Sequence, residues 1–412
     1  MADQYDVIVV GGGAAGMMAA VRAAERGRRV LLLEKNKQLG KKLAMTGGGR
    51  CNIMNAEEDI HRLLDHYGEA AKFLYSPFAQ FGVSETHDFF ERHGLPLVTQ
   101  AHLRVFPKTE RAVDVVKLFE KLLQTSGVEV RTGVTVRRIL WSKKSITGVE
   151  IEGEVLTAES YIVATGGVSH PETGSTGDGF HWLQNSGHDV RQPTPTIVPL
   201  AVADAWVTSL AGITLSDVKI TFFLNGKKEL KLRGRILLTH FGLSGPLILN
   251  AAGDVADLLH DGEVTAMIDT HPDRDLGALD RYLTETFDAN KNKELKNVMK
   301  VIAPTGTADA VLSLVPSIDP ATKVHSITKA QRKMLVDLLK ALPVHITGLM
   351  GYDRAVVADG GVALTGIDPK TMRSRQYPNL YLTGDLLDIS RPSGGYSLQL
   401  CWTSGWVAGS NA

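Results

Sequence analysis

The sequence has only two cysteines, Cys51 and Cys401, among its 412 residues. So few cysteines exclude a disulfide framework and are typical of a reducing compartment, and we therefore expect a cytoplasmic protein. Long hydrophobic runs are also missing, because no apolar stretch reaches the roughly 18 residues that a membrane-spanning helix needs. The sequence therefore predicts no membrane partner.

Net charge is absent as well, since 45 acidic residues balance 45 basic ones. This balance leaves no overall electrostatic attraction for nucleic acid or for an anionic membrane, and we expect neither as a partner. The 13 histidines have no metal-ligand spacing. His87, His93 and His102 fall on a polar helix and the loop after it, where solvated or capping roles are expected. No metal site is predicted.

The sequence does contain a glycine-rich motif directly after an apolar run near its start. Residues 7–10 are followed by Gly11, Gly13 and Gly16 in the spacing G-x-G-x-x-G, and then by an alanine-rich segment. This order predicts a strand, a tight turn and a helix. The glycines permit the turn, the approach of backbone to a pyrophosphate, and close helix packing, while the helix start presents unpaired amides to the phosphates.

A second apolar strand, expected over residues 29–33, ends at Glu34, where a carboxylate can accept both hydroxyls of a ribose. The uncharged run over residues 7–21 also resembles the core of a signal peptide. A signal peptide needs a positively charged start, however, and the residues before this run include Asp3 and Asp6 and no Lys or Arg. The first unit is therefore interpreted as a dinucleotide-binding unit.

The end of the chain distinguishes FAD from NAD. A strand over residues 380–382 delivers Gly384 and Asp385, and about ten residues later Gly394, Gly395 and Tyr396 open a helix. In FAD enzymes of this layout, the carboxylate binds the ribitol chain and the helix start faces the flavin pyrimidine. A second strand-associated G-x-G-x-x-G is missing, because the glycines of residues 174–179 do not directly follow a strand. We therefore predict non-covalent FAD, with NAD(P)H as a possible electron donor.

The middle of the chain has a different character. Strands expected over residues 127–163 end at Ala164, Thr165 and Gly166, and prolines punctuate the chain from about residue 192. Residues 217–239 predict a hairpin turning at Asn225 and Gly226, and residues 276–301 and 328–341 have helical periodicity. We expect an FAD-binding domain over 1–191, an inserted domain over 192–343 with a helical subdomain at about 274–341, and a return to the first domain over 344–412.

At this point the sequence resembles the BaiN-like or YhiN-like flavoproteins, also called aminoacetone oxidase-like FAD-binding enzymes. The resemblance covers nearly the whole chain and rests on the glycine triplet with Glu34, on TGGGRCN at residues 46–52, on TGSTGDGF at 173–180 and on LLTHFGLSGP at 237–246. It implies an α/β fold, a glutathione-reductase-type Rossmann-like FAD domain with an inserted β-barrel and a small helical bundle. The family often has Glu where Asp385 stands and Asn where Ser397 stands.

Motifs and resemblance together give the residues expected to contact FAD. They are the glycine turn, the acid that follows the second strand, the loop after it, the strand ends and the start of the last helix. The candidates are Gly11, Gly13, Ala14, Ala15, Gly16, Glu34, Lys35, Lys42, Thr46, Gly47, Gly48, Gly49, Arg50, Cys51, Asn52, Val136, Ala164, Thr165, Gly166, Gly384, Asp385, Gly394, Gly395, Tyr396 and Ser397.

Two further residues carry competing interpretations. Cys51 has no near cysteine partner, so a space-filling role competes with a redox role. His240 lies in a glycine-rich loop and is the candidate catalytic acid or base, against a structural role fixed by hydrogen bonds. Ser244 lacks the G-x-S-x-G spacing of a hydrolase nucleophile.

The sequence predicts an FAD-dependent oxidoreductase that transfers hydride between a small organic substrate, such as an amine, an amino ketone or an enone, and flavin N5. The alternatives are a relative of the fumarate reductases and ketosteroid dehydrogenases, an NAD(P)H-dependent flavin reductase, an FAD-dependent tRNA modifier, and a non-catalytic flavin-binding protein. Nothing in the sequence indicates an oligomeric state.

Overall fold

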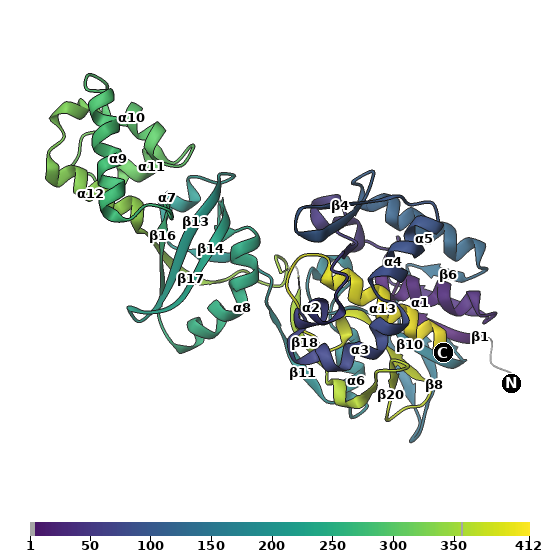
Figure 1. Ribbon diagram of the computed structural model, residues 1–412. Helices are drawn as coiled ribbons and strands as arrows, with labels where there is room; N and C mark the ends of the chain where they lie inside the picture. Colours follow the sequence, from purple (N-terminus) through teal and green to yellow (C-terminus); the bar gives the residue numbers. More distant parts are fainter. Residues whose placement is uncertain (1–4, 356) are drawn as a thin grey trace. The chain divides into compact units, whose positions relative to one another are not determined.

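The computed structural model describes residues 5–355 and 357–412. The chain forms two compact units: a first unit of residues 1–194 and 356–412, and an inserted unit of residues 195–355 (Figure 1). The second boundary differs from the one expected at residue 343. Strand β17 (Leu342–Leu349) pairs with two strands of the inserted unit, and the inserted unit therefore extends to residue 355.

The first unit is built on a mostly parallel sheet in the order β19-β20-β21-β10-β1-β2-β6. Its central strands are β1 (Tyr5–Val10), β2 (Val30–Glu34) and β10 (Ala158–Val163). β1, β2 and the second half of β10 are almost wholly apolar and buried, as expected for parallel strands covered on both faces. The other strands are β6 (Glu129–Thr132), β19 (Ile367–Asp368), β20 (Arg373–Ser374) and β21 (Leu380–Leu382). Four parallel pairings bring the carboxyl ends of β1, β2, β10, β21 and β6 to one edge.

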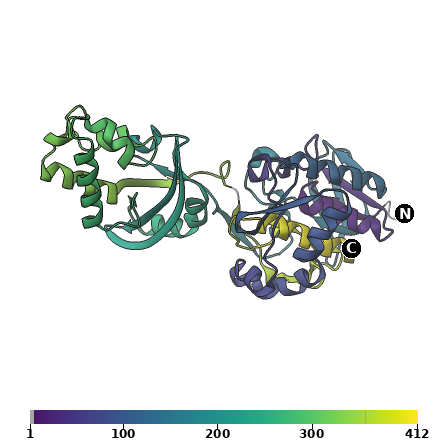
Figure 2. The same ribbon diagram turned by 45° about the horizontal axis from the view of Figure 1, so that its top comes forward.

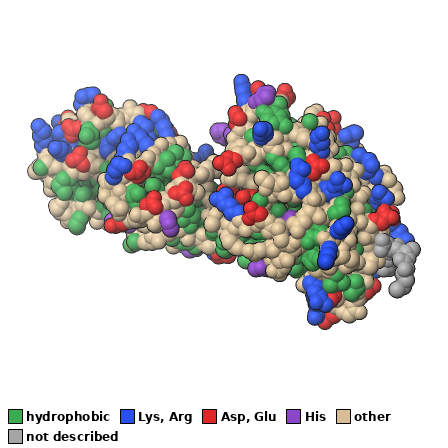
Figure 3. All heavy atoms as spheres, turned by 90° about the horizontal axis from the view of Figure 1, so that it is seen from below, with side chains coloured by type: hydrophobic (Ala, Val, Ile, Leu, Met, Phe, Trp, Pro, Cys, Tyr) green, Lys and Arg blue, Asp and Glu red, His purple; other side chains and the backbone are tan. Residues whose placement is uncertain are grey.

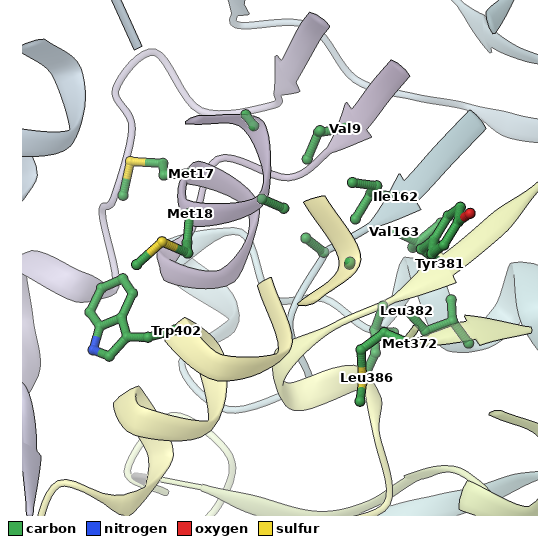
Figure 4. Packing of buried hydrophobic residues seen from close by; sticks show 14 of the residues in the cluster. Val9, Met17, Met18, Ile162, Val163, Met372, Tyr381, Leu382, Leu386 and Trp402 are labelled. Carbon is green, nitrogen blue, oxygen red and sulfur yellow. The ribbon is translucent and has the colours of Figure 1, made fainter. Parts of the chain in front are cut away.

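Two helices from opposite ends of the chain pack against each other on this sheet. Helix α1 (Ala14–Glu25) contacts α13 (Tyr396–Asn411) at two glycines of α13. A Cβ atom at Gly405 would lie 2.4 Å from the Ala15 carbonyl oxygen, and one at Gly409 would lie 2.3 Å from the Ala19 carbonyl oxygen. Figure 4 shows Trp402 of α13 beside the methionines of α1 in the surrounding core. The two helices can therefore approach this closely only because Gly405 and Gly409 have no side chain.

Further helices and small sheets complete the first unit (Figure 1). The helices are α2 (Ile60–Asp65), α3 (Ala71–Gln80), α4 (Val83–Arg92), α5 (Ala112–Thr125) and α6 (Asp178–Asn185). The small sheets are β3-β5-β4 (Met54–Asn55, Arg104–Pro107, Leu97–Gln100), β7-β8-β9 (Arg138–Trp141, Ile146–Ile151, Glu154–Leu156) and β11-β18 (Val190–Pro195, Ala358–Val362).

The inserted unit contains a closed barrel in the order β12-β15-β14-β13-β16-β17. Its longest strands join at Asn225 and Gly226, both with positive φ, which is the two-residue hairpin turn that the sequence predicts. Figure 2 shows these strands, in teal, curving around the barrel. The strands are β12 (Leu200–Val202), β13 (Thr214–Leu224), β14 (Lys227–Thr239), β15 (Gly242–Ser244) and β16 (Val264–Asp269), with β17 as given above.

The helices of the inserted unit lie on parts of the barrel surface, with α9 to α12 grouped together at one end (Figure 1). Helix α8 packs on the barrel strands, and a helical group shares one continuous apolar core with the barrel. The helices are α7 (Ala205–Thr208), α8 (Pro246–Asp261), α9 (Leu276–Ala289), α10 (Leu295–Ile302), α11 (Ala308–Ser313) and α12 (Lys329–Lys340). Within residues 5–355 and 357–412, none of the helices has the length and apolarity needed to cross a bilayer.

Candidate functional site

A cavity opens at the carboxyl edge of the parallel sheet in the first unit. Its walls come from segments that lie far apart in the sequence: the glycine turn after β1, the end of β2, the turn after β10 and the segment after β21. Dinucleotides bind at this edge in open α/β sheets because strand ends and helix starts meet there. The topology alone therefore makes this cavity the candidate cofactor site.

The glycine turn forms one wall of the cavity. Gly11 has φ of 109°, and a Cβ atom there would lie 2.4 Å from the Ala164 carbonyl oxygen. A Cβ at Gly16 would lie 1.9 Å from the Gly11 oxygen, whereas one at Gly13 would meet no atom within 4 Å. The first and third glycines thus permit packing, and the second leaves room for a ligand. Because α1 starts at Ala14 with no side-chain cap, its first amides and the positive end of its dipole remain for an anion.

Glu34 lies at the end of β2 and lines the cavity. Its Oε2 accepts a hydrogen bond from the Gly12 amide at 2.7 Å, and its Oε1 accepts bonds from the amide and the side chain of Asn36, each at 2.7 Å. These donors fix a carboxylate that is only 8% exposed. A carboxylate has about four acceptor positions, so these three donors leave one position for a ribose hydroxyl.

The segment from Thr173 to Asp178 also borders this end of the cavity, and it was missing from the sequence-based candidates. The Lys35 ammonium donates to Thr176 Oγ1 at 2.6 Å and to Asp178 Oδ2 at 2.7 Å. The Asn36 side chain donates to the Thr173 carbonyl at 2.9 Å. This segment belongs to the motif TGSTGDGF, whose many glycines and hydroxyl side chains are typical of a ligand-binding loop and could have indicated its role from the sequence.

Lys42, Asp385, Ser397 and Cys401 also line the cavity. The Lys42 ammonium donates to Ser169 Oγ at 3.2 Å. Burial lowers the pKa of Lys42, and the Asp385 carboxylate opposes this shift. Burial also raises the pKa of the Cys401 thiol to about 12, so this side chain stays protonated. The cavity wall therefore combines the buried ammonium group of Lys42 with the carboxylate of Asp385.

The loop from Thr46 to Asn52 lies next to the cavity, although only Thr46 is part of its wall. Gly47, Gly48 and Gly49 all have positive φ, between 59° and 85°, and are exposed. Arg50 does not reach the cavity wall. Its guanidinium donates to Gln100 and Glu110 and lies 4.3 Å from the centre of the Phe106 ring.

Cys51 is fully buried, and its amide closes the loop by donating to the Thr46 carbonyl at 3.0 Å. Burial raises the pKa of its thiol to about 12. A thiol needs to ionise in order to act as a nucleophile or redox partner. The surroundings of Cys51 therefore favour the space-filling role over the redox role.

The start of α13 is held by the backbone of β3. Gly395 has φ of 105°, and a Cβ there would lie 2.3 Å from the Met54 carbonyl carbon. Gly394 has φ of 135°, and a Cβ there would meet only the ring of Tyr396, at 3.0 Å. Asn55 links the two segments, because its side chain donates to the Gly394 carbonyl at 3.3 Å. Gly395 is thus required for packing whatever the helix start faces.

The residues of the cavity fit FAD. Two buried hydroxyls in its wall, those of Thr165 and Thr383, have no hydrogen-bond partner among the described residues and can serve a ligand. Glu34 and Asp385 offer carboxylates that can accept hydrogen bonds from hydroxyl groups of the cofactor, and the uncapped start of α1 offers amides for its phosphates. We therefore assign the cavity to the cofactor.

The structure places the sequence-based candidates in two groups. Those in the cavity wall are Gly11, Gly13, Ala14, Ala15, Glu34, Lys35, Lys42, Thr46, Val136, Ala164, Thr165, Gly166, Gly384, Asp385 and Ser397. Those outside the wall are Gly16, Gly47, Gly48, Gly49, Arg50, Cys51, Asn52, Gly394, Gly395 and Tyr396. Contact of the second group with the flavin remains a prediction.

His240 lies in the inserted unit, in the turn between β14 and β15. Its ring is exposed and contacts Phe241 edge to face, with 4.8 Å between ring centres. Two bonds between Thr239 and Gly242 hold this turn. A catalytic role for His240 stays a prediction. Over the part of the chain that the structure describes, no cluster of three or more His, Cys, Asp or Glu side chains is placed to hold a metal ion.

The fold and the cavity define a flavin-dependent oxidoreductase. The particular family follows from sequence comparison: residues 5–411 match the family described as HI0933-like protein Rossmann domain, and the chain belongs to this family. This agrees with the resemblance to the BaiN-like flavoproteins.

Two kinds of curated relative are similar over the whole chain. A 3-dehydro-bile acid delta(4,6)-reductase of Clostridium scindens is 30% identical over 97% of this chain and 97% of its own length. A ribosomal RNA dihydrouridine synthase of Escherichia coli is 28% identical over 98% of this chain and 97% of its own length.

Solved structures share the fold at low sequence identity. A flavocytochrome c3 fumarate reductase in its open conformation has a TM-score of 0.55 with 15% identity, covering all of this chain and 78% of that one. A 3-ketosteroid-delta4-(5alpha)-dehydrogenase of Rhodococcus jostii RHA1 has a TM-score of 0.53 with 14% identity, covering all of this chain and 97% of that one. These likenesses establish the fold.

Proposed function

We propose that this protein is an FAD-dependent reductase that saturates a carbon–carbon double bond conjugated to a carbonyl group. The cavity carries the cofactor part of the proposal, because its wall brings together the glycine turn and the carboxylates of Glu34 and Asp385 from three separate segments of the chain. The names of the curated relatives support the reaction. Both a 3-oxo bile acid with double bonds at positions 4 and 6 and a uracil ring contain a double bond conjugated to a carbonyl.

When bound and reduced, FAD supplies a hydride to the β carbon of such a substrate, and a proton is added to the α carbon. The chain's own residues bind and orient the cofactor. Glu34 would hold the ribose, the first amides of α1 would hold the pyrophosphate, and Asp385 would hold the ribitol. His240 is the proposed proton donor. NAD(P)H is the proposed electron donor.

The experiment starts from purified protein whose chromophore is released by denaturation and identified. The flavin is reduced without oxygen, once with NADH or NADPH and once with dithionite. Cyclohexenone, a steroid 4-en-3-one and uridine are then added separately, with cyclohexanone as the saturated control. We expect an unsaturated carbonyl to restore the absorbance of oxidised flavin faster than the control does. Equal rates with all compounds would overturn the proposal.

A second candidate substrate is a uridine within RNA, and one observation favours it. Strand β14 carries a run of basic residues, Lys227, Lys228, Lys231, Arg233 and Arg235, with a single acidic residue among them. Their side chains are exposed, and Figure 3 shows Lys and Arg side chains grouped on the inserted unit. The neutral overall charge predicted no nucleic-acid partner, but affinity for phosphates depends on local charge.

Arg233 is engaged with Asp217 and Asp273, which leaves Lys231 and Arg235 as the more informative positions. The test measures binding of a ribosomal RNA fragment as a function of salt concentration, for the natural protein and for Lys231→Glu/Arg235→Glu. A matched control, Lys296→Glu/Lys300→Glu, changes the same charge on α10. RNA-dependent function predicts that only the β14 variant loses affinity and salt dependence. No binding at low salt would exclude this second candidate.

A further inference from the structure

A buried arginine lies directly behind the cavity, in the loop before α13. Arg391 is only 4% exposed, although it follows a serine and precedes a proline in a segment with the composition of a surface loop. Arginine is almost never fully buried unless it is paired. The contacts of Arg391 therefore indicate what its burial achieves.

Each of the three guanidinium nitrogens of Arg391 has a defined acceptor. Nε donates to Ser397 Oγ at 3.1 Å, Nη1 donates to the Ile389 carbonyl oxygen, and Nη2 donates to Asp385 Oδ1. The Asp385 and Ser397 side chains belong to the cavity wall, and the guanidinium lies behind them. Arg391 thus joins the segment after β21 to the first turn of α13. It acts on the cavity only through its two partners.

The charges of Asp385 and of the groups around it determine whether the oxidised or the reduced flavin is bound more tightly. Two-electron reduction with uptake of one proton leaves a negative charge at flavin N1. An unpaired Asp385 carboxylate would oppose that charge, strongly so because buried charges are poorly screened. The Arg391 guanidinium cancels the carboxylate charge, so the Lys42 ammonium, which also lines the cavity, favours the reduced state without opposition.

We propose that Arg391 is a positioning residue that holds Asp385 and Ser397 at the cavity wall and neutralises the carboxylate, so that the site favours reduced FAD. The inference rests on the proposed FAD site. It adds a determinant of the flavin potential that neither the glycine motif nor the last helix supplies.

The test is a cycle of variants read out as the midpoint potential of bound FAD, measured by anaerobic dye equilibration. Arg391→Gln leaves the carboxylate unpaired. The affinity for reduced FAD, relative to the affinity for oxidised FAD, should fall at least tenfold, which lowers the midpoint potential by about 30 mV. Asp385→Asn leaves the guanidinium unpaired and should shift the potential upward. The double variant Arg391→Gln/Asp385→Asn should return close to the natural value.

A charge effect predicts potential shifts of opposite sign in the two single variants, and these shifts should cancel in the double variant. A loosened loop would instead shift the potential or the FAD occupancy in the same direction in all three variants. Arg391→Lys, which keeps the charge, should retain most of the potential. Arg131→Gln is the matched control, because Arg131 pairs with Glu129 at 2.8 Å on the edge strand β6 of the same unit.

The inference is overturned if Arg391→Gln and Asp385→Asn shift the potential in the same direction, or if neither changes the relative affinity by more than threefold. If Arg391→Gln does not retain FAD, the other two variants decide the question. Asp385→Asn should still shift the potential upward, and Arg391→Lys should still retain most of the natural potential. A released chromophore other than FAD would contradict the proposed function itself, whereas bound FAD with unmoved potentials contradicts only the role of Arg391.

Discussion

Replacement of Glu34 by glutamine tests the cofactor site at its best-defined group. The carboxylate accepts three hydrogen bonds of 2.7 Å, one from the Gly12 amide and two from Asn36. In glutamine one of the two oxygens becomes an NH₂ group, which cannot accept. The cheapest arrangement keeps the oxygen toward Asn36 and turns the NH₂ group toward Gly12, leaving that buried amide without its acceptor.

The expected magnitudes follow from these contacts. A buried donor without an acceptor costs about 1 to 3 kcal/mol, which should appear in the free energy of unfolding of the apoprotein. One bond from a ribose hydroxyl would also lose its charged acceptor, at a cost of about 1 to 1.5 kcal/mol. This cost corresponds to roughly 5- to 13-fold weaker binding of FAD.

The assay titrates apoprotein with FAD and follows the fluorescence of the flavin, and urea unfolding is measured with and without FAD to separate stability from affinity. Glu129→Gln is the matched control, because Glu129 is also a hydrogen-bonded carboxylate of the first unit but is absent from the cavity wall. An FAD affinity of the Glu34 variant within threefold of the natural protein would refute the assignment of Glu34 to the ribose.

Three further predictions concern stability and are all read from urea unfolding. Gly405→Val should cost about 1 to 3 kcal/mol or more, because its Cβ would meet the Ala15 carbonyl at 2.4 Å and force α1 and α13 apart; an unchanged midpoint would contradict this packing. Trp402→Ala should cost about 3 to 5 kcal/mol, since the indole is fully buried. Burial lowers the pKa of His188, so the unfolded chain binds a proton first, and stability should fall as the pH drops below about 6.5. His188→Asn should flatten that dependence, and an equal slope would show that other groups cause it.

Local sequence predicted the dinucleotide-binding unit because the information lies within about thirty residues. The order of strand, glycine turn, helix, strand and acid ending at Glu34 is read along the chain, and the turn at Asn225 and Gly226 is equally local. Helical periodicity was less exact. Residues 276–301 form two helices, α9 and α10, that are interrupted after Ala289. The interruption is stabilised by a distant contact, the bond from the Leu295 amide to the Thr322 carbonyl.

The rest of the site depended on contacts between distant segments. Lys35 meets Asp178 across the cavity edge, and no periodicity relates these positions. Arg391 has the appearance of a solvated loop residue until Asp385 is placed beside it. Glycines at 405 and 409 read as weaknesses in a helix, and only the carbonyls of α1 explain them. Sequence patterns therefore predicted the central elements and 15 of the 33 residues of the cavity wall, but not the pairings that fix its side chains.

The packing of α1 on α13 also has a consequence for synthesis of the chain. The first helix and the last helix are partners, so the ribosome releases α1 long before its partner exists, and the whole inserted unit is made in between. The inserted unit has its own apolar core and can fold while the first unit still waits for its final strand and helix. Truncation near the C-terminus should therefore leave a folded inserted unit attached to an aggregation-prone first unit, whose apolar helix α1 would remain uncovered.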